Sequence, residues 1–158
     1  MQDNVLSNTT DQALSSNAIR TVADEPLWLK NFVRVYQDLS TDNLELLETI
    51  YHNHVTFTDP IHKIEGFDNL YHYFESLYQN LVSCEFIIEH VITQNCHAAV
   101  YWKMTYQHAK LNQGKVVSIV GNSHIKGEGD KVFYQRDYLD LGAMLYEQIP
   151  VLGKIILW

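Results

Sequence analysis

The sequence predicts an α+β fold in which N-terminal helices pack on one side of a curved antiparallel sheet. Apolar residues recur at helical spacing in the first half of the chain, up to about residue 81. Beyond that point the pattern changes to the alternation typical of strands, in four segments near 85–93, 97–109, 115–126 and 131–140. Short turns separate the last three segments, so these strands are expected to pair as an antiparallel meander.

Three helices are expected before the meander. The first begins at Pro26, because proline suits the first turn of a helix, and it continues through Leu39. The second follows an N-cap at Asp42, where Glu45 three residues later completes an acidic variant of the capping box. The third comes after a short strand and a loop.

That short strand, at 55–58, is the most informative part of the chain. It ends at Asp59-Pro60, and a loop at 59–65 leads into the third helix at 68–81. A carboxylate is thus fixed at the end of a strand, next to a residue that cannot extend the hydrogen-bonded ladder. Because binding and catalytic residues often occupy such rigid positions beside open loops, the segment predicts a pocket.

Composition limits the classes of function. With 158 residues, the chain is long enough for one domain with a single core. A net charge of −8, with only 11 Lys and Arg residues, argues against nucleic acid as a partner. The 10 Tyr, 6 Phe and 3 Trp residues suit a concave apolar site.

The two ends differ from the domain predicted at 26–141. Residues 1–25 read as a flexible polar tail without a signal peptide, and 142–158 as an apolar helical extension. Either this extension packs on the domain or on a partner, or the natural chain continues past Trp158. No apolar run reaches the length of about 18 residues that a membrane span needs. Cys84 and Cys96 form neither a disulfide framework nor a CxxC motif, which favours reduced thiols and a cytoplasmic location.

Alternation separates the two faces of the strand at 97–109. Its apolar side chains, which should face the helices, are Val100, Trp102, Met104 and Tyr106. In the strands at 115–126 and 131–140 the two faces are about equally polar, so alternation alone does not choose between them.

These features together resemble a SnoaL-like domain of the nuclear transport factor 2-like superfamily, which includes ketosteroid isomerase, limonene epoxide hydrolase and polyketide cyclases. The residues that carry the resemblance are Asp59-Pro60 at the end of the strand, Gly66 before a helix, and the RDYLD segment at 136–140. The resemblance covers roughly residues 27–141. It implies a cone, in which a strongly bent sheet wraps around three helices and a cavity opens at one end.

The resemblance also implies site residues. Asp59 resembles the general base of ketosteroid isomerase, and Asn122 falls where that enzyme has its oxyanion-binding aspartate. The same threading turns four further side chains inward: His124, Gln135, Asp137 and Leu139. The isomerase's oxyanion tyrosine falls at Val35, and the Arg–Asp pair of the epoxide hydrolase is absent, so no catalytic set transfers whole.

Two functional hypotheses follow. In the first, the domain binds a small apolar molecule with one or two polar groups, and works without a cofactor as an isomerase, lyase or cyclase. Asp59 would be the general base, its pKa raised by apolar surroundings, with Asp137, Asn122 and His124 in support. The expected ligand-binding residues are Phe57, His62, Trp102, Met104, Tyr106, Gln135 and Leu139. In the second, the fold is a non-catalytic interaction module. There the open face of the sheet and the apolar C-terminus would form a homodimer or bind another protein, and a homodimer is the expected assembly.

The candidate site residues also have structural alternatives. Asp59 could cap its loop by accepting the backbone N–H groups that follow it, and Asp137 could form an ion pair with Arg136. Asn122 and His124 could form a hydrogen-bonded polar pair within the sheet. These alternatives stay open at the level of sequence.

No metal site is predicted. His52 and His54 lie near Asp59 in the sequence, but they fall outside the expected cone. A metal site needs three or four converging ligands, which this spacing does not supply.

Overall fold

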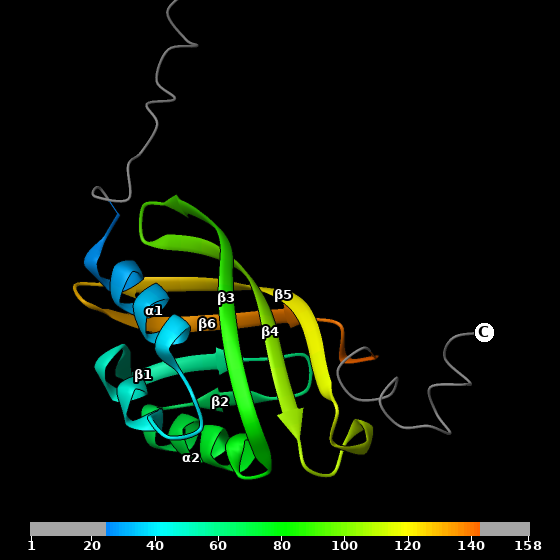
Figure 1. Ribbon diagram of the computed structural model, residues 1–158. Coiled ribbons are helices and arrows are strands. Elements are labelled where there is room, and N and C mark those ends of the chain that lie inside the picture. Colours follow the sequence, from blue (N-terminus) through cyan, green and yellow to red (C-terminus); the bar gives the residue numbers. More distant parts are fainter. Residues whose placement is uncertain (1–24, 143–158) are drawn as a thin grey trace, which may run out of the picture.

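The computed structural model describes residues 25–142, which form the predicted α+β fold (Figure 1). Its helices are α1 (Leu27–Asp38), the 3-10 helix η2 (Leu44–Thr49), α2 (Phe67–Tyr78) and the 3-10 turn η3 (Asn112–Gly114). Its strands are β1 (Tyr51–Thr58), β2 (Lys63–Glu65), β3 (Leu81–Gln94), β4 (His97–His108), β5 (Val116–Glu128) and β6 (Lys131–Leu139).

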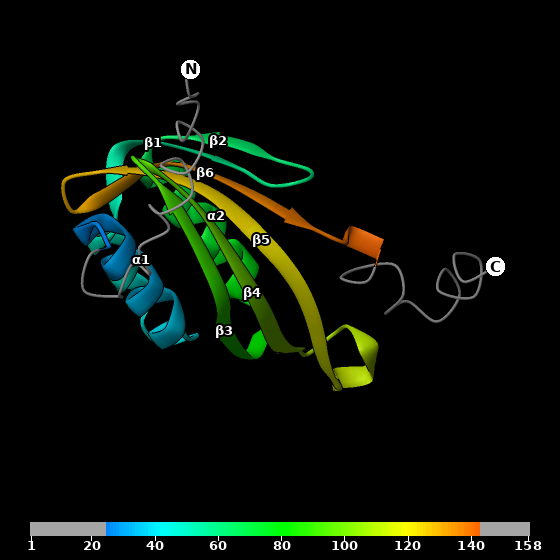
Figure 2. The ribbon, with the colours of Figure 1, turned by 90° about the horizontal axis from the view of Figure 1, so that it is seen from above.

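The strands form one sheet in the order β2-β1-β6-β5-β4-β3. Strands β1 and β6 run parallel, and every other neighbouring pair runs antiparallel. In Figure 1, β3 and β4 run across the direction of β1 and β2, which shows how strongly the sheet bends. Helices α1 and α2 pack on the inner side of this bend (Figure 2). The result is the cone that the resemblance implied.

One core fills the space between the sheet and the helices. Strand β4 contributes the face that alternation predicted: Val100, Trp102 and Tyr106 are buried, and Met104 packs against them partly buried. Helix α1 packs on the inner side of β3, β5 and β6 with an apolar stripe at helical spacing. The buried residues of that stripe are Trp28, Leu29, Phe32, Val35 and Tyr36.

The segment between α1 and β1 differs from the prediction. Asp42 does not cap a helix; a six-residue 3-10 helix follows Asn43 instead, without a side-chain cap. The Asn43 side chain instead bonds to the backbone that precedes it. It accepts a hydrogen bond from the Ser40 N–H at 2.7 Å and donates one to the Asp38 carbonyl at 2.8 Å. Strand β1 begins earlier than expected, because Tyr51 already pairs with β6.

The predicted inner face of β5 is wrong. In an antiparallel pair, residues directly opposite each other share a face of the sheet. Ser123 lies opposite Asp137, whereas His124 lies opposite the exposed Arg136 and Asn122 opposite the exposed Tyr138. Ser123 is buried on the inner face, so Asn122 and His124 point outward.

A glycine explains why hydrophobicity could not identify this face. A Cβ atom at Gly121 would lie 2.5 Å from the Trp102 ring, so only glycine lets the indole lie against β5 at that point. The indole Nε1–H then donates to Ser123 Oγ at 2.9 Å. The inner face of β5 therefore holds a glycine and a serine where the pattern calls for large apolar residues.

The predicted tail at 1–25 and the predicted extension at 142–158 lie outside the described residues, apart from Glu25 and Gly142. Within the described part of the chain, the helices are too short and too polar to cross a membrane.

Candidate functional site

A cavity of about 340 Å³ lies between α2 and the inner face of the sheet. Its wall is mostly aromatic and aliphatic, which is typical of sites for small organic molecules. Six of the predicted ligand-binding residues line it: Phe57, His62, Trp102, Met104, Tyr106 and Leu139. Both predicted carboxylates, Asp59 and Asp137, also line this cavity.

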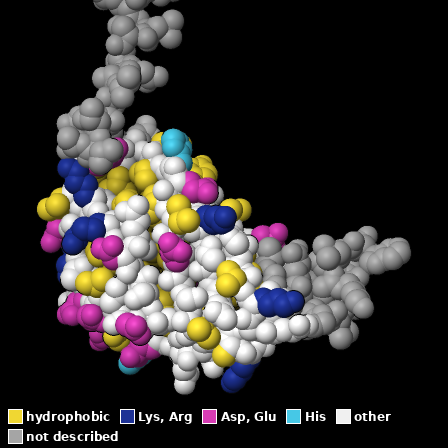
Figure 3. All heavy atoms as spheres, in the orientation of Figure 1, with side chains coloured by type: hydrophobic (Ala, Val, Ile, Leu, Met, Phe, Trp, Pro, Cys, Tyr) yellow, Lys and Arg dark blue, Asp and Glu magenta, His cyan; other side chains and the backbone are white. Residues whose placement is uncertain are grey.

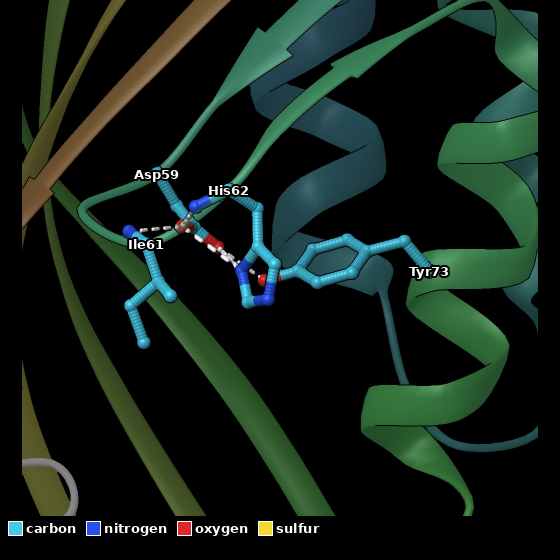
Figure 4. Close-up of polar contacts among 4 residues, drawn as sticks. All are labelled: Asp59, Ile61, His62 and Tyr73. Atoms are coloured by element: carbon cyan, nitrogen blue, oxygen red, sulfur yellow. Dashed lines mark hydrogen bonds and ion pairs between the residues drawn. The ribbon is translucent and has the colours of Figure 1, made fainter.

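Asp59 closes the loop between β1 and β2. Its Oδ1 accepts the backbone N–H groups of Ile61 at 2.7 Å and of His62 at 2.6 Å (Figure 4). Its own N–H donates to the His62 carbonyl at 3.0 Å. The structural alternative for Asp59, that it caps its loop, is therefore observed.

The second carboxylate oxygen of Asp59 is also engaged. The Tyr73 hydroxyl, from α2, donates to Oδ2, and His62 Nδ1 lies 3.1 Å from the same atom (Figure 4). Burial alone would raise the pKa of Asp59, but the hydrogen bonds from Tyr73, Ile61 and His62 outweigh it and hold the pKa below its ordinary value. The expectation that apolar surroundings raise the pKa of Asp59 is thus wrong in sign.

Asp137 has the opposite electrostatic setting. Burial raises the pKa of its carboxyl to about 6, even though hydrogen bonds from Ser123 and Gln135 oppose the shift, and the nearby charge of Asp59 adds to it. The predicted alternative, an ion pair with Arg136, does not form. Arg136 points outward, and its guanidinium lies 5.1 Å from the centre of the Tyr138 ring.

The two hydrogen bonds to Asp137 reach the same oxygen. Ser123 Oγ donates to Oδ1 at 2.6 Å, and Gln135 Nε2 donates to Oδ1 at 2.8 Å. Among the described residues no donor reaches Oδ2, and the carboxyl lines the cavity. One oxygen of Asp137 is thus fixed by two hydrogen bonds, and the other has no hydrogen-bond donor among the described residues.

Gln135 points inward as predicted, but it lies beneath the cavity wall. Its Oε1 accepts from the Tyr51 hydroxyl at 2.5 Å, and the Tyr51 and Tyr36 hydroxyl oxygens are 2.6 Å apart. This fully buried chain fixes the amide that donates to Asp137. Gln135 therefore positions the carboxyl, and it is not among the described residues that line the cavity.

Asn122 and His124 lie on the outer face of the sheet, so their side chains do not line this cavity. His124 Nε2 lies 3.0 Å from His97 Nδ1, which ties it to the start of β4. The polar inner residue of β5 is Ser123, which sequence reasoning missed together with Tyr51 and Tyr73. The inward position of Ser123 follows from the pairing of β5 with β6, in which Ser123 lies opposite Asp137.

A second hollow lies outside the cone, between η2 and α2. This open groove of about 730 Å³ is lined by acidic side chains, and Figure 3 shows acids gathered over this part of the surface. Within residues 25–142 there is no group of three or more His, Cys, Asp or Glu side chains placed to hold a metal ion. His52 and His54 lie side by side on β1, with ring centres 5.0 Å apart.

The fold and the cavity define a class of protein: small cone-shaped α+β domains that enclose a cavity between a bent sheet and its helices. The chain belongs to the SnoaL-like domain family, whose profile matches residues 32–135. This match confirms the resemblance seen in the sequence.

Solved structures agree on the fold. A candidate SnoaL-like polyketide cyclase from Jannaschia sp. CCS1 superposes with a TM-score of 0.67 at 13% identity, covering 78% of this chain and 94% of that one. A candidate SnoaL-like polyketide cyclase from Shewanella putrefaciens CN-32 has a TM-score of 0.64 at 19% identity, with coverages of 77% and 95%.

A third similar structure is a protein of ketosteroid isomerase-like fold from Catenulispora acidiphila, in complex with trimethylamine. It has a TM-score of 0.66 at 11% identity, and the alignment covers 78% of this chain and 92% of that one. Identities this low support the fold alone. The search of curated proteins found no match.

Proposed function

We propose that this chain binds a small, mostly apolar molecule in the cavity and moves a proton on it through Asp137, as an isomerase, lyase or cyclase. The observation that carries the proposal is the carboxyl of Asp137, which lines the cavity and has Oδ1 held by two hydrogen bonds, while no described residue donates to Oδ2. The protein thus fixes the orientation of this carboxyl and leaves one atom to react, as general acid–base catalysis requires.

The pKa of Asp137 supports this role. A pKa of about 6 leaves both the protonated and the ionised form accessible near neutral pH, so the carboxyl can accept a proton or donate one. Asp59 is less suited to the role of base that the sequence suggested, because both of its oxygens already accept hydrogen bonds and its pKa is lowered. Its part is to hold the loop and Tyr73 at the rim of the cavity.

The named relatives point in the same direction. Two of them are candidate polyketide cyclases, and a third holds a small molecule, trimethylamine. A cavity of about 340 Å³ suits a compact ligand of one or two rings.

Proton transfer is testable without the natural substrate. A panel of carbon acids (a β,γ-unsaturated ketone, a β-diketone and an α-aminoketone) is incubated in D₂O, and deuterium uptake at carbon is followed by NMR. The wild type should accelerate uptake, and Asp137→Asn should reduce the rate about 10²-fold or more. Asp130→Asn, the same change in an exposed turn, is the matched control and should leave the rate unchanged.

Two results would overturn the proposal. One is that Asp137→Asn exchanges every bound compound as fast as Asp130→Asn does. The other is that none of the panel enters the cavity, as judged from the NMR signal of the Trp102 indole N–H.

We infer a second role for the outer face of the sheet as a homodimer interface. Four large apolar side chains on β3, β4, β5 and β6 are exposed there: Ile87, Tyr101, Val120 and Tyr138. Exposed apolar residues grouped on one face favour association with a partner. Val120→Asp should shift the protein toward monomer in sedimentation velocity, and an unchanged sedimentation coefficient would count against this interface.

We also propose a cytoplasmic location, because the two cysteines are not paired with each other. Cys84 is buried and Cys96 is exposed, and neither is paired with the other.

A further inference from the structure

The hydrogen-bond donors around the inner part of the cavity are already used within the protein. The Ser123 hydroxyl donates to Asp137, and the Trp102 indole N–H donates to Ser123. The Tyr73 hydroxyl donates to Asp59, and the Tyr78 hydroxyl donates to the Cys84 sulfur. A ligand that needs donors from the wall, such as a carbonyl compound or an anion, therefore finds few of them.

The cavity wall still offers hydrogen-bond acceptors and negative charge to a ligand. Asp59 and Asp137 both line the cavity, and the described lining residues include no Lys or Arg. His62 and His108 are the lining side chains that can carry a positive charge, and His62 lies against Asp59. Asp137 thus lines the cavity with an oxygen, Oδ2, that has no cationic partner among the described residues.

Aromatic rings form much of the remaining wall, eight side chains in all: Tyr36, Phe57, Tyr73, Phe74, Tyr78, Phe86, Trp102 and Tyr106. Several of them meet edge to face. Phe86 and Trp102 have ring centres 5.6 Å apart at an interplanar angle of 76°, and Phe86 meets Tyr36 at 5.3 Å and 82°. The negative face of an aromatic ring attracts cations, so such walls suit a positively charged organic group.

We propose that the ligand of this cavity is a protonated amine, whose N–H donates to Asp137 Oδ2 while its hydrocarbon part packs against the aromatic wall. This inference rests on the proposed function, and it names the class of molecule on which that function acts. The ligand supplies the two things that the cavity lacks, a donor and a positive charge. The net charge of −8 on the whole chain also attracts cations toward the protein.

Three probes of similar shape and different charge test the proposal. They are 2-phenylethylamine, 2-phenylethanol and phenylacetate, titrated at pH 8 into 15N-labelled protein. Binding is followed at the Trp102 indole N–H, which lies in the cavity wall. This signal separates cavity binding from loose binding at the acidic outer groove, where the reporters are the backbone N–H groups of Asp68 and Asn69.

The amine should bind about tenfold or more tightly than the alcohol, which is the gain expected of a charge-assisted hydrogen bond. Phenylacetate should bind most weakly of the three. Asp137→Asn should remove most of the preference for the amine over the alcohol, whereas Asp130→Asn should keep it.

The possible failures are distinguishable. Equal affinities for amine and alcohol, or tightest binding of phenylacetate, would overturn the amine inference and leave the small-molecule function standing. A preference for the amine that Asp137→Asn does not change would show that Asp137 is not its partner, and would also overturn the inference. If none of the probes shifts the Trp102 signal, the inference and the proposed function fail together.

Discussion

Replacing Asp137 by Asn removes a buried carboxyl whose ionisation lowers the unfolding free energy of the protein. Burial raises the pKa of this carboxyl from an ordinary value of 3.8 to about 6. Between those values the folded protein keeps a proton that the unfolded chain has already released, so stability falls as the pH rises through this window. The difference between the two pKa values corresponds to about 3 kcal/mol of lost unfolding free energy above pH 7.

Urea unfolding of the wild type and Asp137→Asn, at pH 4.5 and at pH 8, measures this cost. The amide oxygen of Asn keeps an acceptor for Ser123 and Gln135, and the amide does not titrate. The unfolding free energy of the variant minus that of the wild type should therefore increase by about 2 kcal/mol from pH 4.5 to pH 8. Groups that titrate alike in both proteins cancel in this difference. The control, Asp130→Asn, should show no such increase.

A difference that stays the same at both pH values would mean that Asp137 titrates alike in the folded and unfolded chains, and that its pKa is not raised by burial. A difference that decreases with pH would mean that the protein stabilises the ionised carboxylate. In either case Asp137 would be an ordinary hydrogen-bonded carboxylate, and its assignment as the proton-transfer group would lose its electrostatic support.

Three further substitutions test other parts of the structure. Asp59→Asn should lower the unfolding free energy by about 1.5–3 kcal/mol, because it weakens the charge-assisted hydrogen bonds that close the loop; an unchanged urea midpoint would contradict the capping role. Gly121→Ala should cost about 1–3 kcal/mol, because its Cβ would lie 2.5 Å from the Trp102 ring, and a neutral effect would show that the ring moves aside freely. Ser123→Ala should raise the pKa of Asp137 further, since it removes a hydrogen bond that favours the ionised form, and an NMR titration that finds the pKa lowered would contradict this contact.

Much of the fold follows from periodicity. The alternation in β4 identified the inward set around Trp102, because its two faces differ clearly in polarity. Helix α1 was predicted from its apolar stripe for the same reason. In both elements one side packs on the core and the other meets water, and this contrast is what a sequence pattern records.

The face of β5 could not be predicted in this way, because two of its inner positions, Gly121 and Ser123, are small or polar. Gly121 makes room for Trp102, and Ser123 serves Trp102 and Asp137. Threading without gaps then assigned Asn122 inward, one residue out of register. In a strand a slip of one residue exchanges the two faces, so the same error placed His124 on the inner face as well, although it points outward.

The site was predicted in part. Both carboxylates do line one cavity, but their electrostatic roles could not be derived from the sequence. The pKa of Asp59 depends on Tyr73, which comes from another element, and on loop N–H groups whose direction depends on the turn. The pKa of Asp137 depends on burial, which follows from the assembled cone.

Two carboxylates line one cavity and differ in protonation, because Asp59 is held ionised as a loop cap while Asp137 titrates near neutral pH. The most direct measurement is a pH titration of the 13C carboxyl signals of both residues by NMR, assigned with Asp59→Asn and Asp137→Asn. We expect Asp137 to titrate near pH 6 and Asp59 to titrate below its ordinary value of 3.8. If Asp137 instead titrates near 4 or below, or if Asp59 has the higher pKa of the two, these assignments of the two carboxylates are wrong.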